Sequence, residues 1–148
     1  MTRAALGTLL LVLATGCRRG DERETVPPDV PPPDRFAAVM DSSLRAGLQR
    51  PGRPPIRVRY SLLRNEPTVT GIAYPKYYLW ACVFSGDSLE RAGAIRVAAI
   101  HGAFELTHFI PHESIRADSA EVGSVFPRPL VAAILERAAL PPGRSCGT

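Results

Sequence analysis

The stretch Tyr77-Tyr78-Leu79-Trp80-Ala81-Cys82-Val83-Phe84 decides the fold of this 148-residue chain. Side chains of a β-strand alternate between its two faces, and here both alternating sets are apolar. This pattern, with its aromatic residues, predicts a central strand that is buried on both faces. A central strand has neighbours along both edges, and the flanking sequence contains candidates for them.

The candidates are one strand before the central strand and a hairpin after it. Residues 56–62, Ile56-Arg57-Val58-Arg59-Tyr60-Ser61-Leu62, alternate strictly and predict a half-buried strand with Arg57 and Arg59 on its polar face. Ser85-Gly86-Asp87 is expected to turn the chain. Residues 94–100 and 104–110 then predict a hairpin joined through His101-Gly102-Ala103. Residues 69–74 are a weaker candidate for a further strand.

The expected hairpin turn sets which side chains share a face of the sheet. If Gly102 and Ala103 form a two-residue turn, one set of alternating side chains lies together on one face. That set is Ile95, Val97, Ala99, His101, Phe104, Leu106, His108 and Ile110. Glu105 falls on the opposite face from His108, and Pro111 is expected to stop the strand.

Helices are predicted at both ends of this sheet. Asp34 is a candidate N-cap for a helix from Arg35 to about Gln49, whose apolar residues recur at three- and four-residue steps. Asp118 is expected to open a short helix that ends near Val125. Pro129 suits the first turn of a last helix that ends near Leu140.

The element order therefore predicts an α+β fold, with an N-terminal helix, a three- or four-stranded antiparallel sheet and C-terminal helices. In layout alone this order resembles the cystatin-like and nuclear-transport-factor-like (NTF2-like) folds. No motif accompanies that resemblance, so it implies nothing about function.

The N-terminus has the order of a secretory signal: Arg3 is basic, residues 4–14 are apolar, and small residues follow. The apolar run is about half as long as a membrane-spanning helix requires. Leu13-Ala14-Thr15-Gly16-Cys17 resembles the lipobox of bacterial lipoproteins, although Ala14 stands where leucine is commoner. The resemblance implies cleavage after Gly16, removal of residues 1–16 as a signal peptide, and acylation of Cys17, which anchors the protein to a membrane.

The segment after Cys17 is predicted to be a spacer. Residues 18–34 contain five prolines and several charges but almost nothing apolar, which favours an extended, disordered tether of a few tens of ångströms. Residues 35–148 are then expected to form a single α+β domain. Arg18 directly follows the cysteine, and by the same resemblance this favours the outer membrane, facing the periplasm, if the bacterium has one.

If Cys17 is acylated, Cys82 and Cys146 are the two cysteines that remain. The secretory signal implies an oxidising compartment, where cysteines tend to pair. We therefore predict a disulfide between them. The alternative is a buried free thiol at Cys82 and an exposed thiol at Cys146.

The charge of the chain is unevenly distributed. Residues 17–34 hold three basic and five acidic side chains, whereas residues 35–148 hold fourteen basic and nine acidic ones. A positive domain favours anionic partners, and in this compartment anionic lipids, cell-wall carboxylates or an envelope protein are better candidates than nucleic acid. Arg57 and Arg59 are the candidate anion-binding residues, against the alternative of a solvated sheet face.

Signals for catalysis are weak. The histidines His101, His108 and His112 are badly spaced for a metal ion, because Pro111 excludes a regular helix between the last two. We expect no metal site and no cofactor. The chain has neither a Gly-x-Ser-x-Gly elbow nor a glycine-rich phosphate loop.

Two functional hypotheses follow. The first is a lipid-anchored binding or structural module of the cell envelope. The second is a small envelope hydrolase or ligand-binding domain with a pocket between helix and sheet, in which His108 is the candidate base. A deep polar pocket that contains His108 and a carboxylate would favour the second, and an open sheet face with exposed aromatic residues the first.

Overall fold

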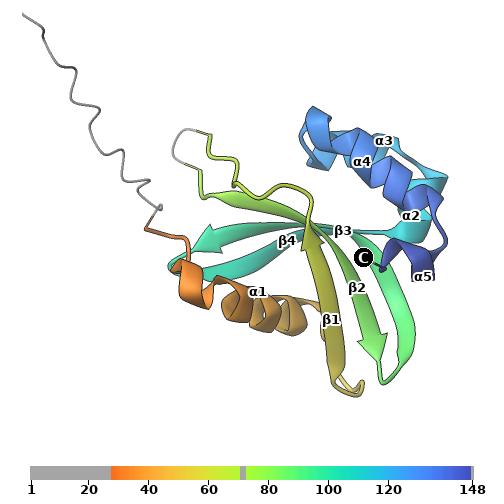
Figure 1. Ribbon diagram of the computed structural model, residues 1–148, viewed down its shortest axis with the longest axis horizontal. Coiled ribbons are helices and arrows are strands. Elements are labelled where there is room, and N and C mark those ends of the chain that lie inside the picture. Colours follow the sequence, from red (N-terminus) through yellow and green to blue (C-terminus); the bar gives the residue numbers. More distant parts are fainter. Residues whose placement is uncertain (1–27, 71–72, 148) are drawn as a thin grey trace, which may run out of the picture.

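The computed structural model describes residues 28–70 and 73–147, and it confirms the α+β layout (Figure 1). The sheet is antiparallel, with four strands in the order in which they occur along the chain. The strands are β1 (Ile56–Leu62), β2 (Lys76–Ser85), β3 (Ser88–Ile100) and β4 (Ala103–Pro111). The helices are α1 (Pro33–Leu48), α2 (His112–Ala117), α3 (Ala120–Val125), α4 (Arg128–Ala139) and α5 (Pro142–Ser145).

The two faces of the sheet are covered by different helices (Figure 1). Helix α1 packs on one face, where Met40 and Leu44 contact a core that includes Leu79 of β2. The C-terminal helices pack on the other face, where Trp80 belongs to a second core together with Ile134 of α4. Strand β2 faces both cores, which explains why both of its side-chain sets are apolar. Its prediction as a central strand buried on both faces is confirmed.

Helix α1 begins earlier than predicted. Its first residue is Pro33, so Asp34 lies in the first turn and is not the N-cap, a position occupied by Pro32 without a side-chain hydrogen bond. The fixed φ of proline is compatible with the first turn, which lets the helix start inside the proline run. At the other end, Gln49 is extended, and its Oε1 accepts a hydrogen bond from the backbone N–H of Ile56.

The described residues include part of the segment that was expected to be a tether. The carbonyl oxygen of Asp29 accepts a hydrogen bond from Gly102 N–H (3.0 Å), and Asp29 Oδ1 accepts one from His101 N–H (3.2 Å). Val30 is only 8 % exposed and belongs to the core under α1. The expected boundary at Asp34 was therefore too late. Cys17, the lipobox and most of the expected tether lie outside the described residues.

The turn of the β3–β4 hairpin lies one residue earlier than predicted. His101 and Gly102 occupy it, with φ of 50° and 75°, and Ile100 pairs with Ala103. Two consecutive positive φ values match the twist of the flanking strands, as in a type I′ turn. Moving the turn by one position shifts the pairing of the two strands by two residues, and a shift of two residues leaves each side chain on its original face. The α1 face therefore still holds Val97, Ala99, Phe104 and Leu106, as expected.

A β-bulge then changes the faces in the second half of β4. Val97 pairs with Leu106 but Arg96 pairs with His108, so Thr107 is an extra residue. Beyond the bulge, Phe109 contacts the core under α1 and Ile110 belongs to the core under the C-terminal helices. The prediction that His108 and Ile110 share a face with Phe104 was therefore wrong.

Two further strand predictions need correction. Strand β3 begins at Ser88, immediately after a turn at Gly86 with φ of 56°, and not near residue 94. Of residues 69–74, the four that the structure describes are not in a strand, and only the preceding Thr68 forms a bridge, with Lys76.

The C-terminal helices agree with the predicted ends. The N–H of Ala120 donates to Asp118 Oδ1 (2.9 Å) where α3 begins, and Pro129 lies in the first turn of α4. The short helices α2 and α5 were not predicted, because six- and four-residue helices have no recognisable periodicity. Within the described part of the chain, no helix is both long and apolar enough to span a membrane.

Candidate functional site

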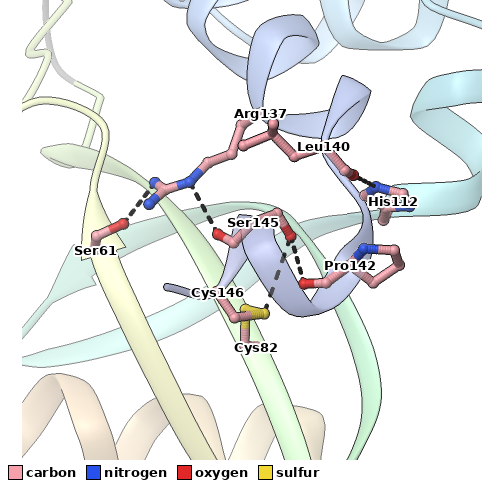
Figure 2. The surroundings of a disulfide bond; sticks show 8 residues. All are labelled: Ser61, Cys82, His112, Arg137, Leu140, Pro142, Ser145 and Cys146. Carbon is pink, nitrogen blue, oxygen red and sulfur yellow. Dashed lines mark hydrogen bonds between the residues drawn. A yellow bond between two sulfur atoms is a disulfide. The ribbon is translucent and has the colours of Figure 1, made fainter. Parts of the chain in front are cut away.

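A disulfide joins the central strand to the C-terminal tail (Figure 2). It links Cys82 of β2 with Cys146, which follows α5, and the two Cα atoms are 5.9 Å apart. Ser145 next to it is buried, and its hydroxyl donates a hydrogen bond to the Pro142 carbonyl oxygen (2.8 Å). The tail is thus fixed against the sheet, as the predicted Cys82–Cys146 pair requires.

A small cleft of about 60 Å³ lies beside this disulfide. It is formed where β1, β2, α4 and the tail meet. Its lining consists of two arginines, polar and aromatic side chains and the disulfide itself: Arg59, Tyr60, Ser61, Trp80, Cys82, Arg137, Ser145 and Cys146. We call it the disulfide cleft. Its lining contains neither a carboxylate nor a histidine.

Arg137 of α4 is held in a fixed position at this cleft. Its Nη1 donates to Ser61 Oγ (2.7 Å) and its Nε donates to the Ser145 carbonyl oxygen (3.2 Å), as Figure 2 shows. The guanidinium carbon lies 5.8 Å from the centroid of the Trp80 ring. Burial lowers the pKa of Arg137 from its usual value, because the charged form loses solvation.

Arg59 supplies a second positive charge to the cleft. It pairs in register with Cys82, so its side chain lies on the same face of the sheet as the disulfide. It lies two positions before Ser61 along β1, which places its Cα roughly 7 Å from the Cα of the residue that anchors Arg137. Among the described residues, neither Arg59 nor Arg137 forms an ion pair with a carboxylate.

Arg57, the other predicted anion-binding residue, lies outside the disulfide cleft. Its guanidinium carbon is 5.3 Å from the centroid of the Phe84 ring, and its Nη2 is 3.7 Å from Asp87 Oδ1. The structure therefore places both predicted arginines on one face of β1, but only Arg59 in a cleft.

Trp80 contributes an unpaired polar atom. The residue is 1 % exposed, and its indole Nε1–H has no hydrogen-bond partner among the described residues. A buried donor without a partner is unfavourable, so the packing of Trp80 against its neighbours must outweigh the lost hydrogen bond.

His108, the candidate base, does not lie in the disulfide cleft. Arg96 Nη2 donates to His108 Nδ1 (2.6 Å), and because an arginine can only donate, the neutral ring carries its proton on Nε2. Arg96 also donates to Thr107 Oγ1 (3.1 Å) and to the Val125 carbonyl oxygen (3.3 Å). The bulge places Glu105 and His108 on the same face, contrary to the prediction. In the described structure His108 has no carboxylate partner, so it lacks the geometry of an activated base.

The other two histidines have structural surroundings. His101 is exposed in the hairpin turn, with Nδ1 3.6 Å from Asp29 Oδ1. His112 is 2 % exposed, and its Nε2 donates to the Leu140 carbonyl oxygen (2.9 Å), which connects the start of α2 to the end of α4. In residues 28–70 and 73–147, no three His, Cys, Asp or Glu side chains are grouped so that they could hold a metal ion.

Sequence reasoning missed Arg137, although a signal for it existed. Arg137 lies three residues after Ile134 and seven after Leu130, on the buried stripe of α4. A charged residue within an apolar stripe needs a specific partner, and this one has three. Ser61 gave no comparable signal, because a serine on the polar face of a strand is usually solvated.

No protein-family model, curated protein or solved structure matches this chain. The geometry and charge of the disulfide cleft are therefore the features of this chain that bear on its function.

Proposed function

We propose that this protein is a lipid-anchored binding module of the bacterial cell envelope, which holds anionic groups of the cell wall against the arginine-bearing face of β1. The lipobox resemblance at Leu13–Cys17 supports the anchor and the compartment. The excess of basic residues in 35–148 supports an anionic partner.

The observation that carries this proposal is the pair Arg59 and Arg137. Both guanidinium groups line one cleft, and in the described structure neither is neutralised by a carboxylate. Arginine recognises carboxylate and phosphate groups through charge-assisted hydrogen bonds, which are stronger than hydrogen bonds between neutral groups. Arg57 lies on the same face of β1, where its exposed ion pair with Asp87 leaves the guanidinium accessible to solvent.

The spacer favours the cell wall over the lipid head groups. Asp29, the first residue seen to hold the chain to the fold, lies twelve positions after Cys17. At about 3 Å per residue such a segment spans up to roughly 40 Å, enough to hold the arginines clear of the bilayer surface. Carboxylates of the wall polymer are then the accessible anions, and lipid head groups are the alternative that the experiment tests.

The disulfide cleft also supports binding over hydrolysis. A hydrolase of the kind considered above needs a general acid or base, and the lining of this cleft offers neither a carboxylate nor a histidine. His108 lies elsewhere, with its Nδ1 lone pair engaged by Arg96.

Cosedimentation tests the proposal. Full-length protein is mixed with isolated peptidoglycan sacculi, and separately with phosphatidylglycerol vesicles, over a range of salt concentrations. Arg57→Gln/Arg59→Gln should weaken binding to sacculi and reduce its salt dependence, because two charges are lost. Arg35→Gln/Arg128→Gln removes the same charge from exposed positions on α1 and α4 and should bind like the wild type. Equal losses in both double variants, or binding to vesicles alone, would contradict the proposal.

The anchor requires its own test. Cys17→Ala should abolish incorporation of labelled palmitate and leave an unprocessed or soluble product. Equal labelling of the variant and the wild type would exclude acylation at Cys17.

A further inference from the structure

The disulfide cleft contains an arginine whose orientation is fixed before any ligand arrives. Nη1 and Nε of Arg137 are occupied by Ser61 and by the Ser145 carbonyl oxygen, whereas Nη2 makes no hydrogen bond to the described residues. A guanidinium that is already immobilised loses little conformational entropy when it binds a further acceptor. The tail that orients it is itself fixed by the disulfide.

The charge around this arginine is not balanced by the protein. Burial disfavours the charged form of Arg137, and Arg59 adds a second positive charge to the same cleft. Without a carboxylate partner for either residue in the described structure, the positive potential is available to a ligand. An anion bound at the cleft would offset the lost solvation of the charged Arg137 side chain.

The size of the cleft limits what can enter. A cleft of about 60 Å³ is small beside ordinary ligand pockets, which favours a compact group of a few non-hydrogen atoms. The geometry points to a subsite in which Arg59 and Arg137 together bind one oxyanion group, a carboxylate or a phosphate. The identity of the polymer that carries this group rests on the proposed function. The new element is the place on the protein where the group binds.

Trp80 makes the subsite directly measurable. It is the only tryptophan in the chain, it lines the cleft, and the Arg137 guanidinium lies over its ring. An anion that binds Arg137 changes the charge next to the indole and should therefore change its fluorescence.

The experiment titrates full-length protein in a neutral detergent with sodium phosphate, and separately with sodium acetate. Sodium chloride holds the ionic strength constant. We expect a saturable change in Trp80 fluorescence, with a midpoint on the order of millimolar for a single small anion. The anion with the lower midpoint identifies the group that the subsite prefers.

Two variants locate the response. Arg59→Gln should raise the midpoint about tenfold, because one charge-assisted contact is lost. Arg59 is exposed and makes no side-chain hydrogen bond in the described structure, so this variant should fold normally. Arg128→Gln is the matched control on α4, outside the cleft, and should keep the wild-type midpoint.

Several results would overturn the subsite. These are the absence of a saturable response to either anion, a response that chloride reproduces, and equal changes in the Arg59 and Arg128 variants. Failure of the proposed function looks different, because small anions would then bind while sacculi would not. If phosphate or acetate displaces bound sacculi at constant ionic strength, the group is carried by the wall polymer. A lack of displacement assigns the subsite to a free anion.

Discussion

Arg137 of α4 donates a hydrogen bond from Nη1 to the hydroxyl oxygen of Ser61 in β1, 2.7 Å away and 76 positions earlier in the chain. This contact connects an edge strand of the sheet to the C-terminal helices. The same guanidinium holds the tail through its Nε bond to Ser145. Arg137 is therefore both a structural tie and one wall of the disulfide cleft.

Removing this tie should destabilise the fold by a measurable amount. Ser61→Ala should lower the free energy of unfolding by about 1 kcal/mol, and Arg137→Gln by about 2–3 kcal/mol, because hydrogen bonds from charged donors contribute more. In urea unfolding, the double variant should lose less than the sum of the two single losses. Strictly additive losses would show that the two side chains do not interact in solution.

The disulfide should make a larger contribution. Cys82 and Cys146 are 64 residues apart, and in the chain-entropy treatment closing such a loop stabilises the fold by about 4 kcal/mol. Cys82→Ala/Cys146→Ala should lower the free energy of unfolding by an amount of that order. Intact-mass analysis of denatured, unreduced protein, treated with an alkylating reagent, should find both residues protected. Alkylation of both thiols before reduction would disprove the bond.

Gly93 is required by the close approach of β3 and β4. A Cβ at this position would overlap the Ile110 carbonyl oxygen and lie 2.8 Å from Cε2 of Phe109. A backbone atom cannot move aside easily, so Gly93→Ala should destabilise the protein by about 3 kcal/mol. Gly123→Ala is the control, because nothing lies within 4 Å of its Cβ position in α3. There the substitution should stabilise by up to about 1 kcal/mol, since alanine favours helix. Similar thermal unfolding of both variants would contradict the β3–β4 register.

The N-terminal boundary can be located by deletion. Removing residues 18–27 should leave the unfolding temperature unchanged, because these residues are mostly polar or charged and Val26 and Pro27 are their only apolar side chains. Removing residues 18–34 should lower it, since Asp29 and Val30 are then lost. Val30→Ala in the full-length chain should by itself cost about 1–2 kcal/mol. An unchanged unfolding temperature in the longer deletion would show that Val30 does not pack in solution.

Two tyrosines predict a loss of stability in alkaline solution. Burial raises the pKa of Tyr60 and of Tyr77 above the usual 10.0, and the negative charge of Asp41 adds to the effect at Tyr60. Above pH 10 the unfolded chain releases these protons while the folded chain retains them, so stability falls as pH rises through that region. Below pH 10 both tyrosines are protonated in the folded and the unfolded chain, so their full contribution to the stability of the fold is present there.

Urea unfolding at about pH 9 and pH 11 measures this effect. Tyr60→Phe/Tyr77→Phe should reduce the loss between the two pH values. An equally large loss in the double variant would assign the alkaline sensitivity to other groups.

Much of the fold could be predicted because it follows from local patterns. The alternation of polar and apolar residues predicted both ends of β1 correctly. The start of α4 could be predicted from Pro129 alone, without knowledge of what the helix packs against. The candidate site was predictable only in part. Arg59 was singled out with its neighbour Arg57, whereas Arg137 was missed, because its role depends on a serine and a tail that lie far from it in the sequence.

The sequence by itself determined that β2 is central, because a strand with two apolar faces is stable only between two covering layers. It also predicted the pairing of Cys82 with Cys146, on the expectation that Cys17 carries lipid. The tertiary structure decided the faces of β4, since the bulge at Thr107 allows Phe109 and Ile110 to be buried in different cores. It also decided that Arg59 and Arg137 line the same cleft. The physical reason is that periodicity is a property of neighbouring residues, whereas a bulge and a cleft depend on packing between segments that are distant in the chain.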